Sequence, residues 1–148
     1  MFEREVDCWI GGCVRQFTNA EGSVARALIA LGEAEQFKPF NAQRIASLRE
    51  RLKAIEESHG HVKAALSAID AYEFYRPFRD IICHGTVTIT ITRRTGWLAI
   101  FENYTSVNGR TEIAVLNVRQ DRANPMLVEI GKACRTLSSS LGQIGKAK

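Results

Sequence analysis

The spacing of apolar residues in this chain changes from a helical period to a strand period immediately after Gly85. Before that point, apolar residues recur every three or four positions, as in helices that bury one face. From Thr86 to Thr92, threonine alternates strictly with valine or isoleucine, which is the pattern of a half-buried strand. The chain is therefore predicted to consist of helices interrupted by one small sheet.

Three helices are predicted before the sheet, over residues 2–35, 41–58 and 61–84. The first carries one apolar stripe from Phe2 to Leu31. Because glycines interrupt this stripe, the segment is either one long helix that packs closely at its glycines or two helices, and we favour one. Asn41 is the predicted N-cap of the second helix. Pro77 is expected to kink the third helix or to mark a new helical start.

After Gly85 the sequence predicts a three-stranded antiparallel meander over residues 86–117. A first turn is expected at residues 93–96, and Asn108-Gly109 is typical of a type I′ hairpin turn. The threonine face of this sheet is expected to meet solvent, and its Val/Ile face to pack on the helices.

A last helix is predicted over residues 124–141, with Asn124 as its N-cap and Pro125 in its first turn. The fold class is therefore mainly α, a helical bundle of about four helices with the meander inserted before the last one. A chain of this length is expected to form a single domain, residues 1–148.

Composition permits several classes of partner and selects none of them. The 148 residues carry a formal net charge of +4, which allows a nucleic-acid partner without demanding one. No apolar run approaches the roughly 20 residues of a bilayer-spanning helix. The four cysteines form no C-x-x-C pair and no zinc spacing with histidine, so they are predicted to be free thiols. We expect a cytoplasmic protein without membrane association, metal or cofactor.

Arg79, Asp80 and His84 lie at the predicted end of the third helix, just before Gly85. A guanidinium binds phosphate oxygens in a fork, and an imidazole moves protons near neutral pH. Positions five apart differ by roughly 140° around a helix, so Arg79 and His84 converge only in the last turn or through a second subunit. In the structural alternative, His84 caps helix carbonyls and Arg79 pairs with an acidic neighbour. The acidic candidates for that pairing are Asp80, Glu73 and Glu102.

The segment R-D-x-x-x-H-G, residues 79–85, resembles the signature of the HEPN family (higher eukaryotes and prokaryotes nucleotide-binding domains). Members of that family are helical bundles with an R-x4–6-H motif, very often written R-N-x-x-x-H-G. The helices before the motif and the last helix fit the family as well, so the resemblance covers most of the chain. The meander looks like an elaboration that follows the motif helix.

Many HEPN proteins are metal-independent endoribonucleases, often toxins of toxin–antitoxin or defence systems, and the resemblance implies that function here. Arg79 would bind the scissile phosphate, and His84 would act as general base or acid on the ribose 2′-OH and the leaving 5′-oxygen. Asp80 would orient Arg79 or His84, and Gly85 would end the motif helix. The implied partners are RNA, a second copy of the chain that completes the site, and an antitoxin, nucleotidyltransferase-like or of another kind.

Two further groups of residues are weaker candidates. Arg76, Arg93 and Arg94 would form an RNA-facing patch with aromatic stacking surfaces, or else belong to a solvated hairpin tip above core aromatics. The aromatic candidates are Tyr75, Trp97 and Tyr104. His59-Gly60-His61 is interpreted as a turn rather than a metal pair, because no cysteine or carboxylate ligand lies nearby.

Aspartate at position 80 leaves a second function open, because asparagine is the commonest residue there in the HEPN family. A carboxylate beside a phosphate site repels anions unless an arginine neutralises it. The alternative to the ribonuclease is therefore a noncatalytic HEPN-like module that binds RNA or nucleotide, or that serves as a partner-interaction subunit. A third reading is a plain helical dimerisation protein, in which Arg79 and His84 only stabilise a helix end.

Overall fold

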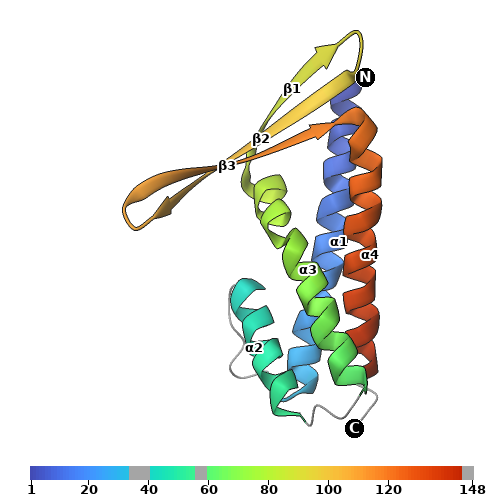
Figure 1. Ribbon diagram of the computed structural model, residues 1–148, viewed down its shortest axis with the longest axis vertical. Helices are drawn as coiled ribbons and strands as arrows, with labels where there is room; N and C mark the ends of the chain where they lie inside the picture. The colour runs from blue at the N-terminus through green and yellow to red at the C-terminus, as the bar shows by residue number, and fades with distance from the viewer. Residues whose placement is uncertain (34–40, 56–59, 145–148) are drawn as a thin grey trace. The chain divides into compact units, whose positions relative to one another are not determined.

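A computed structural model of the protein describes residues 1–33, 41–55 and 60–144. These residues form four helices and one three-stranded sheet (Figure 1). The elements are α1 (Phe2–Ala30), α2 (Asn41–Ala54), α3 (Gly60–His84), β1 (Thr86–Thr92), β2 (Gly96–Val107), β3 (Arg110–Arg119) and α4 (Gln120–Ile144). This order confirms the mainly helical class, with a meander before the last helix.

The first helix, α1, is continuous, as predicted, but it ends at Ala30 rather than running on to residue 35. Gly32 adopts a left-handed φ of 89°. Its amide donates to Ile29 O at 3.0 Å, and the Glu33 amide donates to Leu28 O at 3.0 Å. This pair of bonds is the Schellman motif, which ends a helix at a glycine. The predicted boundary at residue 35 is therefore wrong, because Gly32 ends the helix.

The predicted bounds of the second helix are also corrected. It ends at Ala54 rather than 58, and the Ile55 amide bonds back to Leu52 O at 3.2 Å, which tightens the last turn. At the start of α2, the Nδ2 atom of Asn41 donates to Tyr72 Oη at 3.3 Å. Its Oδ1 accepts no hydrogen bond from any described residue, so the predicted N-cap bond is not made.

The last helix begins at Gln120, directly after β3, and extends to Ile144. Asn124 is therefore not an N-cap, and Pro125 lies inside the helix, where it removes one backbone hydrogen bond. β3 runs to residue 119, two positions beyond the predicted 117, so that no loop separates strand and helix. Asp121 supplies the acidic residue that favours a helix start at this point.

Similarly, α3 continues through Pro77 to His84 as one helix, so a new helical start at the proline is excluded.

The sheet is an antiparallel meander in the order β1-β2-β3, as predicted. Asn108 and Gly109 have φ values of 51° and 75°, which confirms the type I′ turn between β2 and β3. β1 pairs with β2 only as far as Glu102, whereas β2 and β3 remain paired up to Val107. The β2–β3 hairpin therefore continues beyond β1 as a two-stranded ribbon (Figure 1).

The two faces of the sheet differ in burial. The threonines of β1 are exposed, as predicted. The buried face consists of Trp97, Ala99 and Phe101 of β2 and Val118 of β3, which are at most 3% exposed. On the same face of β1, Val87 is 40% and Ile91 57% exposed. The prediction that the Val/Ile face packs on the helices is therefore wrong for Val87 and Ile91, which lie near the two ends of β1, whereas Ile89 between them is half-buried.

The chain divides into two compact units. The sheet unit comprises Met1–Arg15 and Tyr75–Gly131, and the helical unit comprises the described residues of Gln16–Phe74 and Lys132–Lys148. In the helical unit, segments of all four helices contribute to an apolar core, in which the rings of Phe17 and Tyr72 meet edge to face at 6.3 Å.

In the sheet unit, two tryptophans connect the buried sheet face with the helices. The Trp9 ring lies 5.9 Å from that of Phe101, and Trp9 Nε1 donates to Ala123 O at 2.7 Å. Glu5 accepts bonds from Trp97 Nε1 at 3.1 Å and from Gln120 Nε2 at 3.0 Å. These bonds satisfy the polar atoms of large apolar side chains, as burial requires.

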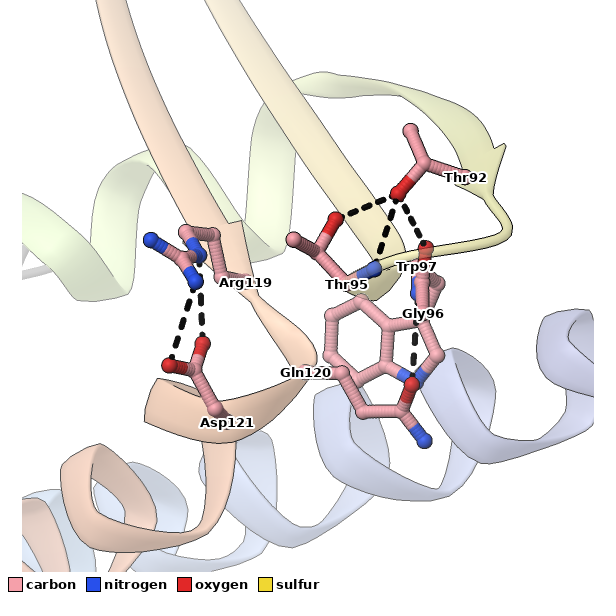
Figure 2. A network of polar contacts seen from close by, with 7 residues as sticks. All are labelled: Thr92, Thr95, Gly96, Trp97, Arg119, Gln120 and Asp121. Carbon is pink, nitrogen blue, oxygen red and sulfur yellow. Dashed lines mark hydrogen bonds and ion pairs between the residues drawn. The ribbon is translucent and has the colours of Figure 1, made fainter.

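Figure 2 shows how the turn between β1 and β2 is anchored to the start of α4. The Trp97 amide donates to Gln120 Oε1 at 3.2 Å. Gly96 has a φ of 73°, and a Cβ at this position would overlap Gln120 Oε1. The left-handed backbone conformation favours glycine here, and any larger residue would also displace the Gln120 side chain.

Candidate functional site

The motif residues lie at the C-terminal end of α3, in the sheet unit. Ile81 and Ile82 are 8% and 5% exposed, so the apolar positions of the motif anchor this end of the helix in the core. His84 is the last helical residue, and the Gly85 amide donates to Ile81 O at 2.8 Å to complete the final turn.

Arg79 and His84 meet within a single chain. Arg79 Nη1 lies 3.2 Å from His84 Nε2, because the long arginine side chain spans the roughly 140° between the two backbone positions. A guanidinium only donates, so Nε2 is the acceptor and the proton of the neutral imidazole is assigned to Nδ1. Among the described residues, His84 has no hydrogen bond to a helix carbonyl, which argues against the capping interpretation.

Asp80 shares the same guanidinium nitrogen. Arg79 Nη1 lies 3.1 Å from Asp80 Oδ1, and the side chains are 22% and 48% exposed respectively. A pair this open to solvent contributes about 0–1 kcal/mol. An incoming phosphate can therefore compete with Asp80 for Arg79. Asp80 was one of the three acidic partners that the sequence suggested for this arginine.

β2 passes directly over Gly85. A Cβ on Gly85 would overlap Ile81 O and would lie 3.0 Å from Glu102 O. Thr86 Oγ1 donates to Glu102 O at 3.4 Å, and the two residues are partners in the strand ladder. Gly85 does not have a left-handed φ, so space rather than backbone conformation requires glycine. This close approach sets the C-terminal end of α3 against the central strand.

The same strand pairing brings a second polar pair near the motif. Tyr104 Oη donates to Glu102 Oε2 at 2.9 Å. This bond, followed by the Glu102 charge, raises the pKa of the Tyr104 phenol. The sequence suggested Glu102 as an ion-pair partner of Arg79 and Tyr104 as a stacking surface for RNA. It did not suggest a hydrogen bond between Glu102 and Tyr104. Only the register of the β1–β2 hairpin could have revealed that Glu102 lies opposite Thr86.

An exposed apolar patch lies on the face of the sheet that carries Glu102. Tyr104, Ile113 and Val115 are 55%, 57% and 54% exposed. Tyr104 lies opposite Ile113, and Glu102 opposite Val115, so all four residues share one face. The apolar patch is therefore continuous with the strand segment that passes over Gly85.

The weaker arginine candidates are dispersed. Arg93 and Arg94 follow the far end of β1, and six residue steps along a strand span roughly 20 Å from Thr86. These two arginines are exposed at a turn and not beside His84. Arg76 lies on α3, one turn before Arg79.

The aromatic candidates also differ in exposure. Trp97 is only 3% exposed and donates to Glu5, so it offers no stacking surface. Tyr104 is 55% exposed. Tyr75 Oη is 3.5 Å from Glu129 Oε2, and burial, followed by the Glu129 charge, raises the pKa of this phenol.

The described part of the chain offers no cluster of three or more histidine, cysteine or acidic residues that could hold a metal ion. None of the four cysteines, all of which lie in the described residues, forms a disulfide bond. His59, one half of the H-x-H pair, lies outside the described residues. None of the helices in the described ranges combines the length and apolarity needed to cross a membrane.

Comparisons with protein-family models, with curated proteins and with solved structures found no match to this chain.

Proposed function

We propose that this protein is a metal-independent endoribonuclease of the HEPN type, which cleaves RNA through the ribose 2′-OH. The observation that carries the proposal is the 3.2 Å contact between Arg79 Nη1 and His84 Nε2 within one chain. It joins a phosphate-binding group with a proton-transfer group at one exposed helix end. The R-x4-H-G spacing supplies the resemblance to the family.

The proposed reaction uses Arg79 and His84 at this helix end, together with a proton donor from a second copy of the chain. His84 Nε2 takes the proton of the 2′-OH, the 2′-oxygen attacks the adjacent phosphorus, and the bond to the 5′-oxygen breaks. The 5′-oxygen leaves with a proton from a general acid, and the other product ends in a 2′,3′-cyclic phosphate. Arg79 binds the phosphate oxygens as charge develops on them. RNA must first draw Arg79 onto its phosphate, which releases the Nε2 lone pair.

The partner and biological role extend this proposal. A homodimer would provide the proton donor opposite His84, and the apolar patch of Tyr104, Ile113 and Val115 supports this assembly because it adjoins the motif. A cytoplasmic toxin of a toxin–antitoxin or defence system, held inactive by an antitoxin, is the role that the family resemblance suggests.

The direct test is cleavage of a mixed-sequence RNA by the purified full chain in the presence of EDTA. We expect fragments with 2′,3′-cyclic phosphate ends and no cleavage of DNA of the same sequence. An otherwise identical RNA with 2′-deoxyribose at the mapped cleavage position should resist cutting at that position. Cleavage of the DNA, or an absolute need for a divalent metal, would contradict the proposal.

The ion pair between Arg79 and Asp80 supports a second candidate, a noncatalytic RNA-binding or partner-interaction module. Asp80 occupies the nitrogen that would bind phosphate, at 3.1 Å. In this alternative, Arg79 and His84 contribute to a binding surface and no bond is broken.

Asp80→Asn is expected to increase affinity for RNA several-fold, because it removes a negative charge beside the phosphate site. Binding is measured by fluorescence anisotropy with a labelled RNA, and cleavage by gel on the same samples. Asp70→Asn is the matched control, since Asp70 is also on α3 and pairs with an arginine, Arg49, at 2.6 Å. A several-fold gain for both variants would mean that net charge alone explains the effect.

The two candidates differ in what accompanies this gain in affinity. Under the ribonuclease proposal, Asp80→Asn also cuts RNA at the wild-type rate or faster. Tight binding by wild type and Asp80→Asn, without cleavage by either, would favour the noncatalytic module.

A further inference from the structure

A polar cavity of about 370 Å³ lies between α1 and α4 in the helical unit. The side chains that line it come from successive turns of both helices. They include Arg26, Arg135, Ser23, Ser138, Asn19 and Gln16. Neither the motif nor the proposed ribonuclease site uses any of these residues.

The lining of this cavity is rich in hydrogen-bond donors and contains no acidic residue. Arg26 and Arg135 each bring a permanent positive charge from a different helix. Over the described ranges, neither arginine has a carboxylate within ion-pair distance. Both arginine side chains are exposed to solvent, so their guanidinium groups are accessible to an anionic ligand.

A partly buried pair of hydroxyl groups positions one of these arginines. Ser23 is 7% exposed, and its Oγ accepts from Arg26 Nη2 at 3.1 Å. Ser23 Oγ also lies 2.8 Å from Ser138 Oγ, which joins α1 to α4. A Cβ on Gly22 would lie 3.3 Å from Arg26 Nη1, so glycine at this position leaves room for the guanidinium to fold back. Arg26 is therefore held at the cavity before any ligand arrives.

Cys134 also lines the cavity. Burial raises the pKa of its thiol to about 12, despite the opposing effect of Arg135. The thiol is therefore neutral near pH 7 and adds no negative charge to the site.

An apolar cavity of about 430 Å³ adjoins the polar one, and the two share Ser23, Arg26 and Ser138. Its apolar lining includes Ala27, Ala30, Leu31, Leu141 and Ile144. Each volume lies in the range of pockets that take small organic molecules. Arg26 thus marks the border between a cationic half and an apolar half.

We propose that this composite cavity binds a small organic phosphate, with the phosphate between Arg26 and Arg135 and the apolar body of the ligand in the adjoining half. Two arginine forks match a phosphate dianion in charge and in number of donors. The adjoining apolar half favours a ligand with a small apolar body over the continuous charged backbone of a nucleic acid.

The test uses the full chain and isothermal titration with phenyl phosphate, inorganic phosphate and phenol. We expect phenyl phosphate to bind at least tenfold more tightly than either of the other two. Arg26→Gln and Arg135→Gln should each weaken its binding at least tenfold. Arg122→Gln is the matched control, because Arg122 is exposed on α4 and does not line the cavity.

Three outcomes would overturn this proposal. They are equal affinity for phenyl phosphate in wild type and both arginine variants, no preference for phenyl phosphate over inorganic phosphate, and competition by an RNA oligonucleotide that depends on Arg26 and Arg135. Because His84→Ala leaves the cavity intact, that variant should bind phenyl phosphate like wild type. The proposal therefore stands or fails separately from ribonuclease activity.

Discussion

His84→Ala is expected to slow RNA cleavage by about 100- to 10,000-fold, the usual contribution of a positioned general acid or base. The variant loses the Nε2 atom that lies 3.2 Å from Arg79, but it keeps the arginine and therefore most of the phosphate attraction. Initial rates of cleavage with EDTA present measure the effect on catalysis, and fluorescence anisotropy measures the effect on RNA affinity. We expect the rate to fall while the affinity changes by less than about threefold.

His61→Ala is the matched control, because His61 is an exposed histidine near the start of the same helix. It should cleave RNA at the wild-type rate. If the His84→Ala variant, with wild-type circular dichroism, cuts RNA as fast as His61→Ala, then His84 does not take part in proton transfer.

Arg79→Ala adds a test of whether the two residues act together. If Arg79 and His84 form one catalytic unit, the double variant should be no slower than the worse single variant, because groups that act as a unit are not additive. If the fold-losses in rate of the two single variants multiply in the double variant, the two residues act independently. That result would conflict with the mechanism in which Arg79 must leave His84 Nε2 before His84 can act.

Gly85→Ala is expected to lower the free energy of unfolding by about 3 kcal/mol. The added Cβ would overlap Ile81 O and would approach Glu102 O at 3.0 Å. Both atoms are backbone carbonyls, which cannot rotate away as a side chain does. Urea denaturation followed by tryptophan fluorescence measures the change.

Gly11→Ala is the matched control for this substitution. Gly11 lies within α1 in the same unit, and an added Cβ would meet nothing within 4 Å. Alanine is the better helix former, so this variant should be more stable by about 0.5–1 kcal/mol. If Gly85→Ala is as stable as wild type, then β2 does not pass over the end of α3 as closely as described.

Much of the candidate site could be predicted from the sequence, because Arg79, Asp80, His84 and Gly85 are neighbours on one helix end. Helix geometry fixes the separation of such residues to within one side-chain length. From the sequence, Arg79 could meet His84 either in the last helical turn or through a second subunit. In the structure the two side chains meet within one chain. The position of Glu102 beside Gly85 could not be predicted, because it depends on the strand register.

The cationic cavity was also beyond sequence reasoning. Arg26 and Arg135 are more than a hundred residues apart, and each by itself has the pattern of an ordinary solvent-facing helix residue. What makes them a pair is the packing of α1 against α4 in the helical unit, which the bond between Ser23 and Ser138 marks. Long-range helix pairing leaves no local signal in the sequence.

The helix boundaries show the same division between local and long-range causes. The Asn108-Gly109 turn was predicted correctly, since its type depends on two residues with positive φ. The end of α1 at Ala30 is equally local and could have been predicted from the capping glycine, Gly32. By contrast, α4 starts at Gln120, where the side chain bonds to Trp97 across the turn.

By itself, the sequence determined which segments are helices and which are strands, where the meander lies, and that an arginine and a histidine share one helix end. Those properties follow from the spacing of apolar residues and from the residue types at turns, which depend on only a few neighbouring residues. Tertiary structure alone decided that β1 leaves Val87 and Ile91 in solvent, that Gly85 lies under β2, and that two distant arginines line one cavity. Each of these depends on which surfaces meet, and that choice comes from packing between segments far apart in the chain.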